Sequence, residues 1–207
     1  RRVYYIDKDL FEAEGEYNII VSTVDKAETT AFSDVKNLTV AFVVDQTKPV
    51  VTITGLEAGG RYQTDEQTVT LIPTDEGGRL KNLCVVVFDS NGNPLTNELG
   101  EDISVRFEMS GDEFLKYLEE NDGKVIFTVP EGLNNQVQII CNDCAINANN
   151  QTNEYNELFE RVTVSQNKLV IFYANKPLFY GSIAGVLGVI LLLIFILVKR
   201  KKKVEDQ

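Results

Sequence analysis

The sequence contains no histidine and no tryptophan, and it has only three cysteines among 207 residues. Without histidine, the commonest general base and the commonest zinc ligand of proteins are both missing. Three cysteines are too few for the disulfide framework of a small secreted domain. The first residues, RRVYYIDKDLFEAEGEYN, contain no apolar signal core, so we expect the chain to be the C-terminal piece of something longer.

Basic residues are also scarce outside one short run. Five of the 20 lysines and arginines stand in 199–203, and two of the 31 acidic residues follow them, which leaves 15 basic against 29 acidic residues before the run. Nucleic-acid binding requires a basic face for the phosphates, so this balance argues against a nucleic-acid partner. It suits the solvated surface of an exterior domain.

One long apolar segment, LFYGSIAGVLGVILLLIFILV, extends from Leu178 to Val198 without a charge. As a helix it would span roughly 31 Å, about the hydrocarbon thickness of a bilayer. Lys199 and Arg200 open the basic run that follows at once, and such a run marks the cytoplasmic side. The alternative is a buried core helix, but core helices seldom extend this far without a polar face.

The charge asymmetry orients this segment. We predict a transmembrane helix over 177–198, with residues 1–175 outside the cell and a basic cytoplasmic tail over 199–207, so that the lipid bilayer is the first partner. Gly181 and Gly185 form a small-xxx-small pair, which would let two such helices approach closely. Glycine is also simply frequent in membrane helices, and we favour this plainer interpretation.

The part before the helix is patterned for strands. Short segments in which apolar residues alternate with polar ones are separated by Gly, Asn and Pro, which is typical of a β-sandwich. These segments are 16–25, 38–45, 50–55, 67–73, 83–89, 103–109, 124–129, 137–141 and 159–164. One short helix is expected near 111–121, because Ser110 and Glu113 have the spacing of a capping box. The predicted fold class is all-β, followed by a single transmembrane helix.

The stretch DSNGN, residues 89–93, contains the hairpin turn signal Asn91-Gly92. The spacing of Asp89, Asn91 and Asn93 also resembles a calcium-binding loop. The glycine is misplaced for such a loop, however, and the twelfth position is a glycine rather than a bidentate glutamate. A turn is therefore the better interpretation.

An internal repeat becomes visible when the chain is shifted by 118 residues. NIIVSTVDKA (18–27) then falls on QVQIICNDCA (136–145), and an Asp and an Ala coincide. Each copy continues through a polar loop into another apolar strand, which ends near Val44 in the first copy and near Val164 in the second. We interpret both copies as a strand that leads into a turn, and the repeat as a sign of tandem domains.

Cys141 and Cys144 have a CxxC spacing, but the first copy of the repeat keeps the element without either cysteine. A zinc site needs four Cys or His ligands and a redox CxxC opens a helix, so we predict neither a metal nor a catalytic site. Three interpretations stay open: buried thiols, a disulfide from Cys84 to one of the pair, or a Cys141–Cys144 bridge. Cys141 shares its strand parity with Val137 and Ile139, and is therefore expected to face the core.

The stretch FVVDQTKPVVTITGLEAGGRY resembles the junction between bacterial Ig-like repeats on surface proteins of Gram-positive bacteria. There, an apolar strand ends one domain, an Asp-Thr-x-x-Pro type linker follows, and the next strand begins; here the linker is DQTKP, residues 45–49. DKAET (25–29) and DCAIN (143–147) are similar to the family's Asp-Lys-Ala-Gly-Asn turn, although both depart from it at the Gly position. The resemblance covers about residues 1–165.

The resemblance implies repeated sandwich modules that are held away from a cell surface, often in adhesion, and it implies no catalytic residues. No LPxTG sorting signal is visible, which leaves the helix as the anchor. Some related modules contain Lys–Asn isopeptide crosslinks, which this sequence alone does not place. We expect residues 1–46 to complete an upstream Ig-like domain and residues 47–175 to form a second, larger one.

The predicted function is a non-catalytic, membrane-proximal stalk of a multi-domain surface protein, which spaces and presents upstream domains and needs no cofactor. Two alternatives stay open. The second domain could itself bind an extracellular glycan or protein through its loops around Asn134–Asn135 and Asn147–Asn153, although Asn-rich loops are more often solvated turns. The chain could also be the accessory C-terminal part of a surface enzyme whose catalytic domain lies upstream.

Overall fold

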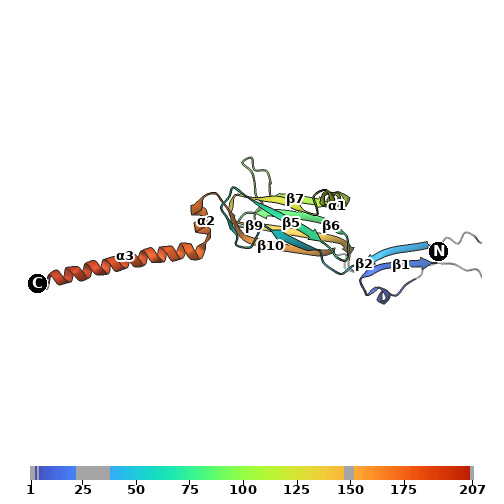
Figure 1. Ribbon diagram of the computed structural model, residues 1–207, viewed down its shortest axis with the longest axis horizontal. Helices are drawn as coiled ribbons and strands as arrows, with labels where there is room; N and C mark the ends of the chain where they lie inside the picture. The colour runs from blue at the N-terminus through green and yellow to red at the C-terminus, as the bar shows by residue number, and fades with distance from the viewer. Residues whose placement is uncertain (1–2, 4, 22–37, 147–151, 206–207) are drawn as a thin grey trace, which may run out of the picture.

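The computed structural model describes residues 3, 5–21, 38–146 and 152–205, and within these ranges the chain consists mainly of strands followed by a long apolar helix (Figure 1). In chain order the elements are η1 (Lys8–Phe11), β1 (Gly15–Val21), β2 (Leu38–Val44), β3 (Val50–Thr54), β4 (Arg61–Tyr62), β5 (Glu66–Thr74), β6 (Leu80–Phe88), β7 (Val105–Ser110), α1 (Gly111–Glu120), β8 (Val125–Pro130), β9 (Gly132–Ile146), β10 (Thr152–Val164), α2 (Lys168–Ala174) and α3 (Lys176–Glu205).

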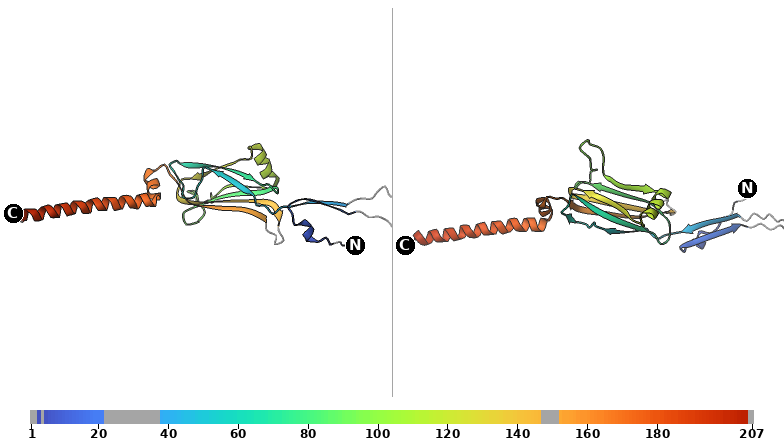
Figure 2. Two further views of the ribbon diagram at one scale, coloured as in Figure 1. Left: turned by 60° about the horizontal axis from the view of Figure 1, so that its bottom comes forward. Right: turned by 45° about the horizontal axis from the view of Figure 1, so that its top comes forward.

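Strands β3 to β10 form two sheets around one core, and we call this part the two-sheet domain. One sheet has the strand order β4-β10-β9-β6-β7, and the other has the order β3-β5-β8. Figure 2 shows the two layers of strands. Leu71 from the smaller sheet and Val85 and Ile139 from the larger one are completely buried in the same hydrophobic cluster. Each such side chain stabilises the fold by about 1.5–3 kcal/mol relative to an exposed position.

The alternation read from the sequence explains which faces are buried. Along β6, Leu83, Val85 and Val87 are fully buried, whereas the residues between them are only half-buried, as the period of two in a strand requires. β9 lies between β6 and β10 and points Val137 and Ile139 into the same core. The central strands are therefore apolar on the face that meets the opposite sheet.

Helix α1 confirms the helix predicted near 111–121 and covers part of the core with Phe114 and Leu118, both buried. The predicted capping box is wrong, because the Ser110 side chain makes no capping hydrogen bond. Ser110 still pairs with Asn82 as the last residue of β7, and Gly111 turns the chain directly into the helix with φ +62°. Glycine adopts such a backbone angle at no steric cost, because it has no Cβ.

Each segment predicted to be a strand lies on a strand of the structure, as far as the described residues extend. β9 and β10 are longer than the predicted 137–141 and 159–164, because they pair with each other over most of their lengths. The turn predicted at 143–147 is wrong for its described part: Asp143 pairs with β6, and the strand continues to Ile146. The corresponding turn at 25–29 lies outside the described residues.

β1 and β2 form a separate antiparallel sheet of two strands, which we call the N-terminal ribbon. Phe11, Tyr17 and Phe42 gather there, with ring centroids 5.0–5.6 Å apart. The ribbon lies at the end of the two-sheet domain opposite to α3 (Figures 1 and 2). Like β9 and β10, its strands form an antiparallel pair that ends where the repeat predicts, at Val44.

At the other end of the domain, α2 leads into α3. The part of α3 from Lys176 to Lys199 is long and apolar enough to cross a membrane, and none of it is buried in the chain. The predicted helix over 177–198 is thus confirmed as an apolar helix. It contains Gly181 and Gly185, and a Cβ added to either would meet open space.

Candidate metal centre at the junction

Three carboxylates meet where the N-terminal ribbon joins the two-sheet domain. Asp45 directly follows β2, Asp75 directly follows β5, and Asp143 lies in the last part of β9. One carboxylate oxygen from each of them lies within 4.8 Å of the other two. We call these three residues the carboxylate cluster. The strands β2, β5 and β9 belong to three different sheets, so the packing of these sheets against one another brings the three residues together.

A glutamate of the ribbon side binds the linker that follows β2 (residues 45–49). The Glu14 Oε1 atom, just before β1, accepts hydrogen bonds from the Gln46 backbone N–H at 2.8 Å and from the Thr47 hydroxyl at 2.7 Å. The Thr47 N–H in turn donates to Asp45 Oδ1 at 3.0 Å. The bond from the Thr47 hydroxyl is the main reason why the pKa of Glu14 is lowered. These bonds connect the ribbon to the linker, but not to the two sheets.

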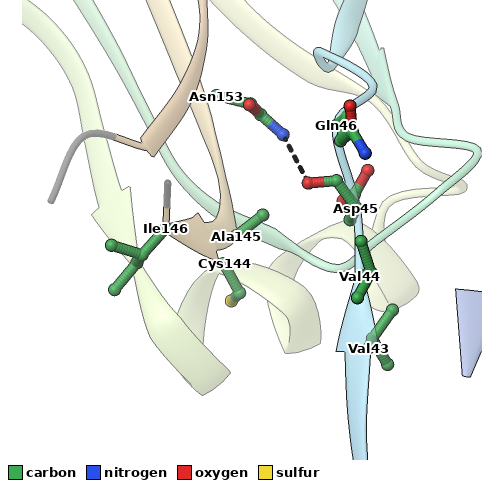
Figure 3. A pocket seen from close by; sticks show the side chains of 8 residues that line it. All are labelled: Val43, Val44, Asp45, Gln46, Cys144, Ala145, Ile146 and Asn153. Atoms are coloured by element: carbon green, nitrogen blue, oxygen red, sulfur yellow. Dashed lines mark hydrogen bonds between the residues drawn. The ribbon is translucent and has the colours of Figure 1, made fainter. Parts of the chain in front are cut away.

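Asn153, at the start of β10, connects the linker to the two-sheet domain. Its Nδ2 atom lies 3.0 Å from the Thr47 carbonyl oxygen, 3.4 Å from the Asp45 carbonyl oxygen and 2.9 Å from Asp143 Oδ2. An amide nitrogen has only two hydrogens, so these three contacts share them. Figure 3 shows the Asn153 side chain reaching across to Asp45 beside a pocket that Cys144 also lines.

The described asparagines that we expected in ligand-binding loops lie in strands. Asn153 is used by the junction, and Asn134 and Asn135 belong to β9 rather than to a loop. Asn135 is buried, and its amide donates to the Pro130 carbonyl oxygen at 3.4 Å. Residues 147–151 lie outside the described residues.

Two oxygens in the carboxylate cluster have no hydrogen-bond partner. Asp45 Oδ2 and Asp75 Oδ2 each expose less than 1 Å² to solvent. Burial raises the pKa of both carboxyl groups above the usual range, and the charge of Asp143 acts in the same direction. In the described part of the chain, Arg79 pairs with Asp112 and Lys116 pairs with Glu120, and no ion pair involves the cluster. No lysine or arginine in the described part of the chain therefore neutralises these three carboxylates.

Two glycines allow the loop after β5 to lie against the linker carboxylate. A Cβ added to Gly77 would collide with Asp45 Oδ1, and one added to Gly78 would collide with Asp45 Oδ2. The Cβ on Gly78 would also lie 3.3 Å from Asp75 Oδ2. Both unpartnered oxygens thus lie next to Gly78, on the same side of the cluster.

The three cysteines are free thiols in the structure: Cys141 is buried, Cys84 is half-buried and Cys144 is exposed. Cys141 pairs with Leu83 across the sheet, whereas Cys84 pairs with Ile140. Facing residues of an antiparallel pair point to the same side, and the next residues point to the other, so Cys84 and Cys141 lie on opposite faces.

Cys141 and Cys144, the CxxC pair, are separated by their distance along β9. Three residues along one strand span about 10 Å, beyond the roughly 7 Å between Cα atoms that a disulfide can bridge. Cys141 faces the core as predicted, and burial raises the pKa of its thiol to about 12, with a further contribution from the charges of Asp75 and Asp143. The buried-thiol interpretation fits Cys141, whereas Cys84 is half-buried and Cys144 is exposed.

Sequence reasoning does not find the carboxylate cluster. It considers calcium at Asp89 instead, where the structure has the preferred turn: Asp89 Oδ1 accepts from the N–H groups of Asn91 and Asn93, each at 2.8 Å. Two members of the cluster were visible in the sequence, Asp45 as the first linker residue and Asp143 as the aspartate that the repeat preserves. Nothing in the sequence singles out Asp75.

The chain matches no protein-family model and no curated protein.

Proposed function

We propose that the chain is the membrane-proximal stalk of a multi-domain bacterial surface protein, which holds upstream domains away from the membrane and has no catalytic role. One observation carries the proposal. The candidate membrane span leaves the two-sheet domain at one end, and the N-terminal ribbon extends from the opposite end (Figures 1 and 2). A chain arranged in this way separates whatever precedes it from the bilayer by the length of the domain.

The residues around the start of α3 suit a membrane surface. The rings of Tyr173 and Phe179 lie 5.2 Å apart, and those of Phe179 and Tyr180 lie 5.5 Å apart. The Lys176 ammonium group lies 3.2 Å from the centroid of the Tyr173 ring. Aromatic residues are enriched where a helix enters the headgroup region, and lysine can extend its ammonium group towards the headgroups. The basic residues that begin at Lys199 favour the anionic inner leaflet.

The ribbon supports the proposal that an Ig-like domain precedes the two-sheet domain. It has the same strand pairing as β9 and β10, but no second sheet covers it among the described residues. An isolated pair of strands is only marginally stable in water, so we propose that the ribbon forms the last two strands of an upstream sandwich domain.

Cell fractionation tests the membrane anchor. The chain, with an added N-terminal secretion signal and a C-terminal epitope tag, is expressed in a Gram-positive host, and we expect it to remain in the membrane pellet after carbonate washing. Protease added to intact cells should digest the two-sheet domain and spare the tag. A chain that carbonate removes, or a tag that is accessible from outside, would contradict the proposal.

A matched pair of variants separates membrane insertion from general effects of a new charge. In the double variant Ile190→Arg with Leu191→Arg, each charge lies in the middle of α3 and costs about 2.5–3.5 kcal/mol of insertion free energy, so release into the soluble fraction is expected. The control, Leu169→Arg, changes an exposed residue of α2 outside the span and should leave the chain in the membrane.

A further inference from the structure

We propose that the carboxylate cluster of Asp45, Asp75 and Asp143 is a Ca²⁺ site that fastens the linker to the two-sheet domain. Calcium binding does not depend on the stalk proposal, because it concerns only the junction. The consequence for the stalk, that calcium stiffens it, rests on that proposal.

The donor atoms are already held in place. Asp143 is fully buried, and both of its oxygens accept hydrogen bonds, Oδ1 from the Ala145 N–H at 2.8 Å and Oδ2 from Asn153. Each of the other two carboxylates has one oxygen that accepts a backbone N–H, from Thr47 and from Gly77, at 3.0 Å and 3.4 Å. The side chains are thus oriented without a metal, as ligands of a prepared site are.

The unpartnered oxygens point to a ligand. Asp45 Oδ2 and Asp75 Oδ2 are buried, accept no hydrogen bond and lie close together beside Gly78. Buried polar atoms are nearly always satisfied, and buried charges are paired or bind metals. A cation between these two oxygens and Asp143 would satisfy both atoms and neutralise three like charges at once.

The chemistry of the donors selects the ion. Carboxylate oxygens are hard ligands that suit Ca²⁺, Mg²⁺ or Mn²⁺, whereas zinc prefers thiolate and imidazole. The chain has no histidine, and the side chain of the nearby Cys141 is buried in the core. Ca²⁺ accepts six to eight oxygens in flexible geometry, which water and carbonyl groups can complete, whereas Mg²⁺ demands near-ideal octahedral geometry. The irregular meeting of a linker, a loop and a strand therefore favours calcium.

Calcium would change the junction more than the domains on either side of it. Asn153 is the side chain of β10 that holds the linker, and Glu14 holds the linker from the ribbon. A cation bound by Asp45 together with Asp75 and Asp143 adds ionic bonds across the same joint. The orientation of the ribbon relative to the two-sheet domain would then depend on the calcium concentration outside the cell.

The full chain in detergent micelles, stripped with EDTA and dialysed, provides the test. Titration with CaCl2 alone in a calorimeter should show one ion per chain, with a dissociation constant of about 10⁻⁴–10⁻³ M, as in extracellular modules. At 10 mM Ca²⁺, the midpoint of thermal unfolding by circular dichroism should rise by about 3–10 °C. Hydrogen exchange of the linker, residues 45–49, should slow.

Variants distinguish a calcium site from a merely structural cluster. Asp75→Asn should weaken calcium binding at least tenfold, yet raise the unfolding temperature in EDTA, because one of three like charges is gone. Asp45→Asn serves as a second variant in case Asp75→Asn does not fold, because Asp45 lies outside both sheets. It should likewise weaken calcium binding and raise the unfolding temperature in EDTA. The control Glu76→Gln changes the exposed neighbour of Asp75 and should leave both measurements unchanged.

Three results would overturn the assignment. These are no response of the wild-type chain to 10 mM Ca²⁺, an equal response to MgCl2, or normal calcium binding by both aspartate variants. Because the measurement is made in detergent, it does not depend on which side of a membrane the domain occupies. Failure of calcium binding is therefore distinct from failure of the stalk proposal, which protease digestion of intact cells decides.

Discussion

The N-terminal ribbon and the β9–β10 pair are both antiparallel pairs of strands, and the sequence repeat relates one to the other. In β9, Ile139 is completely buried, because β6 extends the sheet and the smaller sheet covers it. In the ribbon, Val21, which the repeat aligns with Ile139, is 39% exposed, and its neighbour Ile20 is 62% exposed. The comparison teaches that an alternating pattern specifies a strand, whereas burial, and with it most of the stability, requires a second layer.

Removing a phenylalanine ring should give the largest difference in unfolding free energy between the two regions. Phe114→Ala removes a fully buried ring through which α1 packs on the core, and should lower the free energy of unfolding by about 3–5 kcal/mol. Phe11→Ala removes a half-buried ring that packs edge-on against Tyr17 and Phe42 on the ribbon, so a loss below about 1.5 kcal/mol is expected. Urea unfolding of the full chain in detergent, followed by circular dichroism, measures both. Equal losses would mean that the ribbon is buried by a surface we have not recognised.

Matched isoleucines sharpen the comparison between the strands themselves. Ile139→Ala should cost about 2–5 kcal/mol of unfolding free energy, because it leaves a cavity between the sheets. Ile20→Ala, the same change on an exposed face of the ribbon, should stay within about 0.5 kcal/mol. If the variant in the ribbon were as damaging as the one in β9, the contrast between the two pairs would be lost.

A substitution at the junction between the ribbon and the two-sheet domain should lower the free energy of unfolding less than a substitution in the core does. Gly78→Ala places a methyl group against Asp45 Oδ2, so it should destabilise the chain by about 1–3 kcal/mol. The double variant with Asp45→Ala should lose much of this cost, because the colliding carboxylate is then absent. Thermal unfolding of the two single variants and the double variant measures the coupling. Additive costs would show that the loop and the linker carboxylate do not touch.

Thiol labelling reports how burial differs between positions of the two-sheet domain, and it needs no substitution. Cys144 is exposed and should react first with a maleimide, the half-buried Cys84 should react more slowly, and Cys141 should react only after unfolding. Mass spectrometry of the labelled peptides gives the three rates. Fewer than three reactive thiols in denaturant without a reductant would establish a disulfide and contradict the placement of the cysteines on separate faces.

Much of the fold could be predicted because its signals are local. The period of two along 83–89 and 124–129 identified strands, and the uncharged run from Leu178 to Val198 identified the apolar helix. Local rules failed where pairing with a distant strand competed with them. Ser110 stays in β7 rather than capping α1, and residues 143–146 continue β9 instead of turning.

By itself, the sequence determined the strands, the single apolar helix and the acidic character of the part before it, since each depends on neighbours along the chain. Only the tertiary structure decided that Asp45, Asp75 and Asp143 meet, that Asn153 joins the linker to β9 and that Cys141 and Cys84 face opposite ways. These outcomes depend on strand order and register, which bring residues far apart in sequence to one point. The charge of an aspartate can be read from the sequence, but whether a second aspartate lies beside it depends on the packing of the strands.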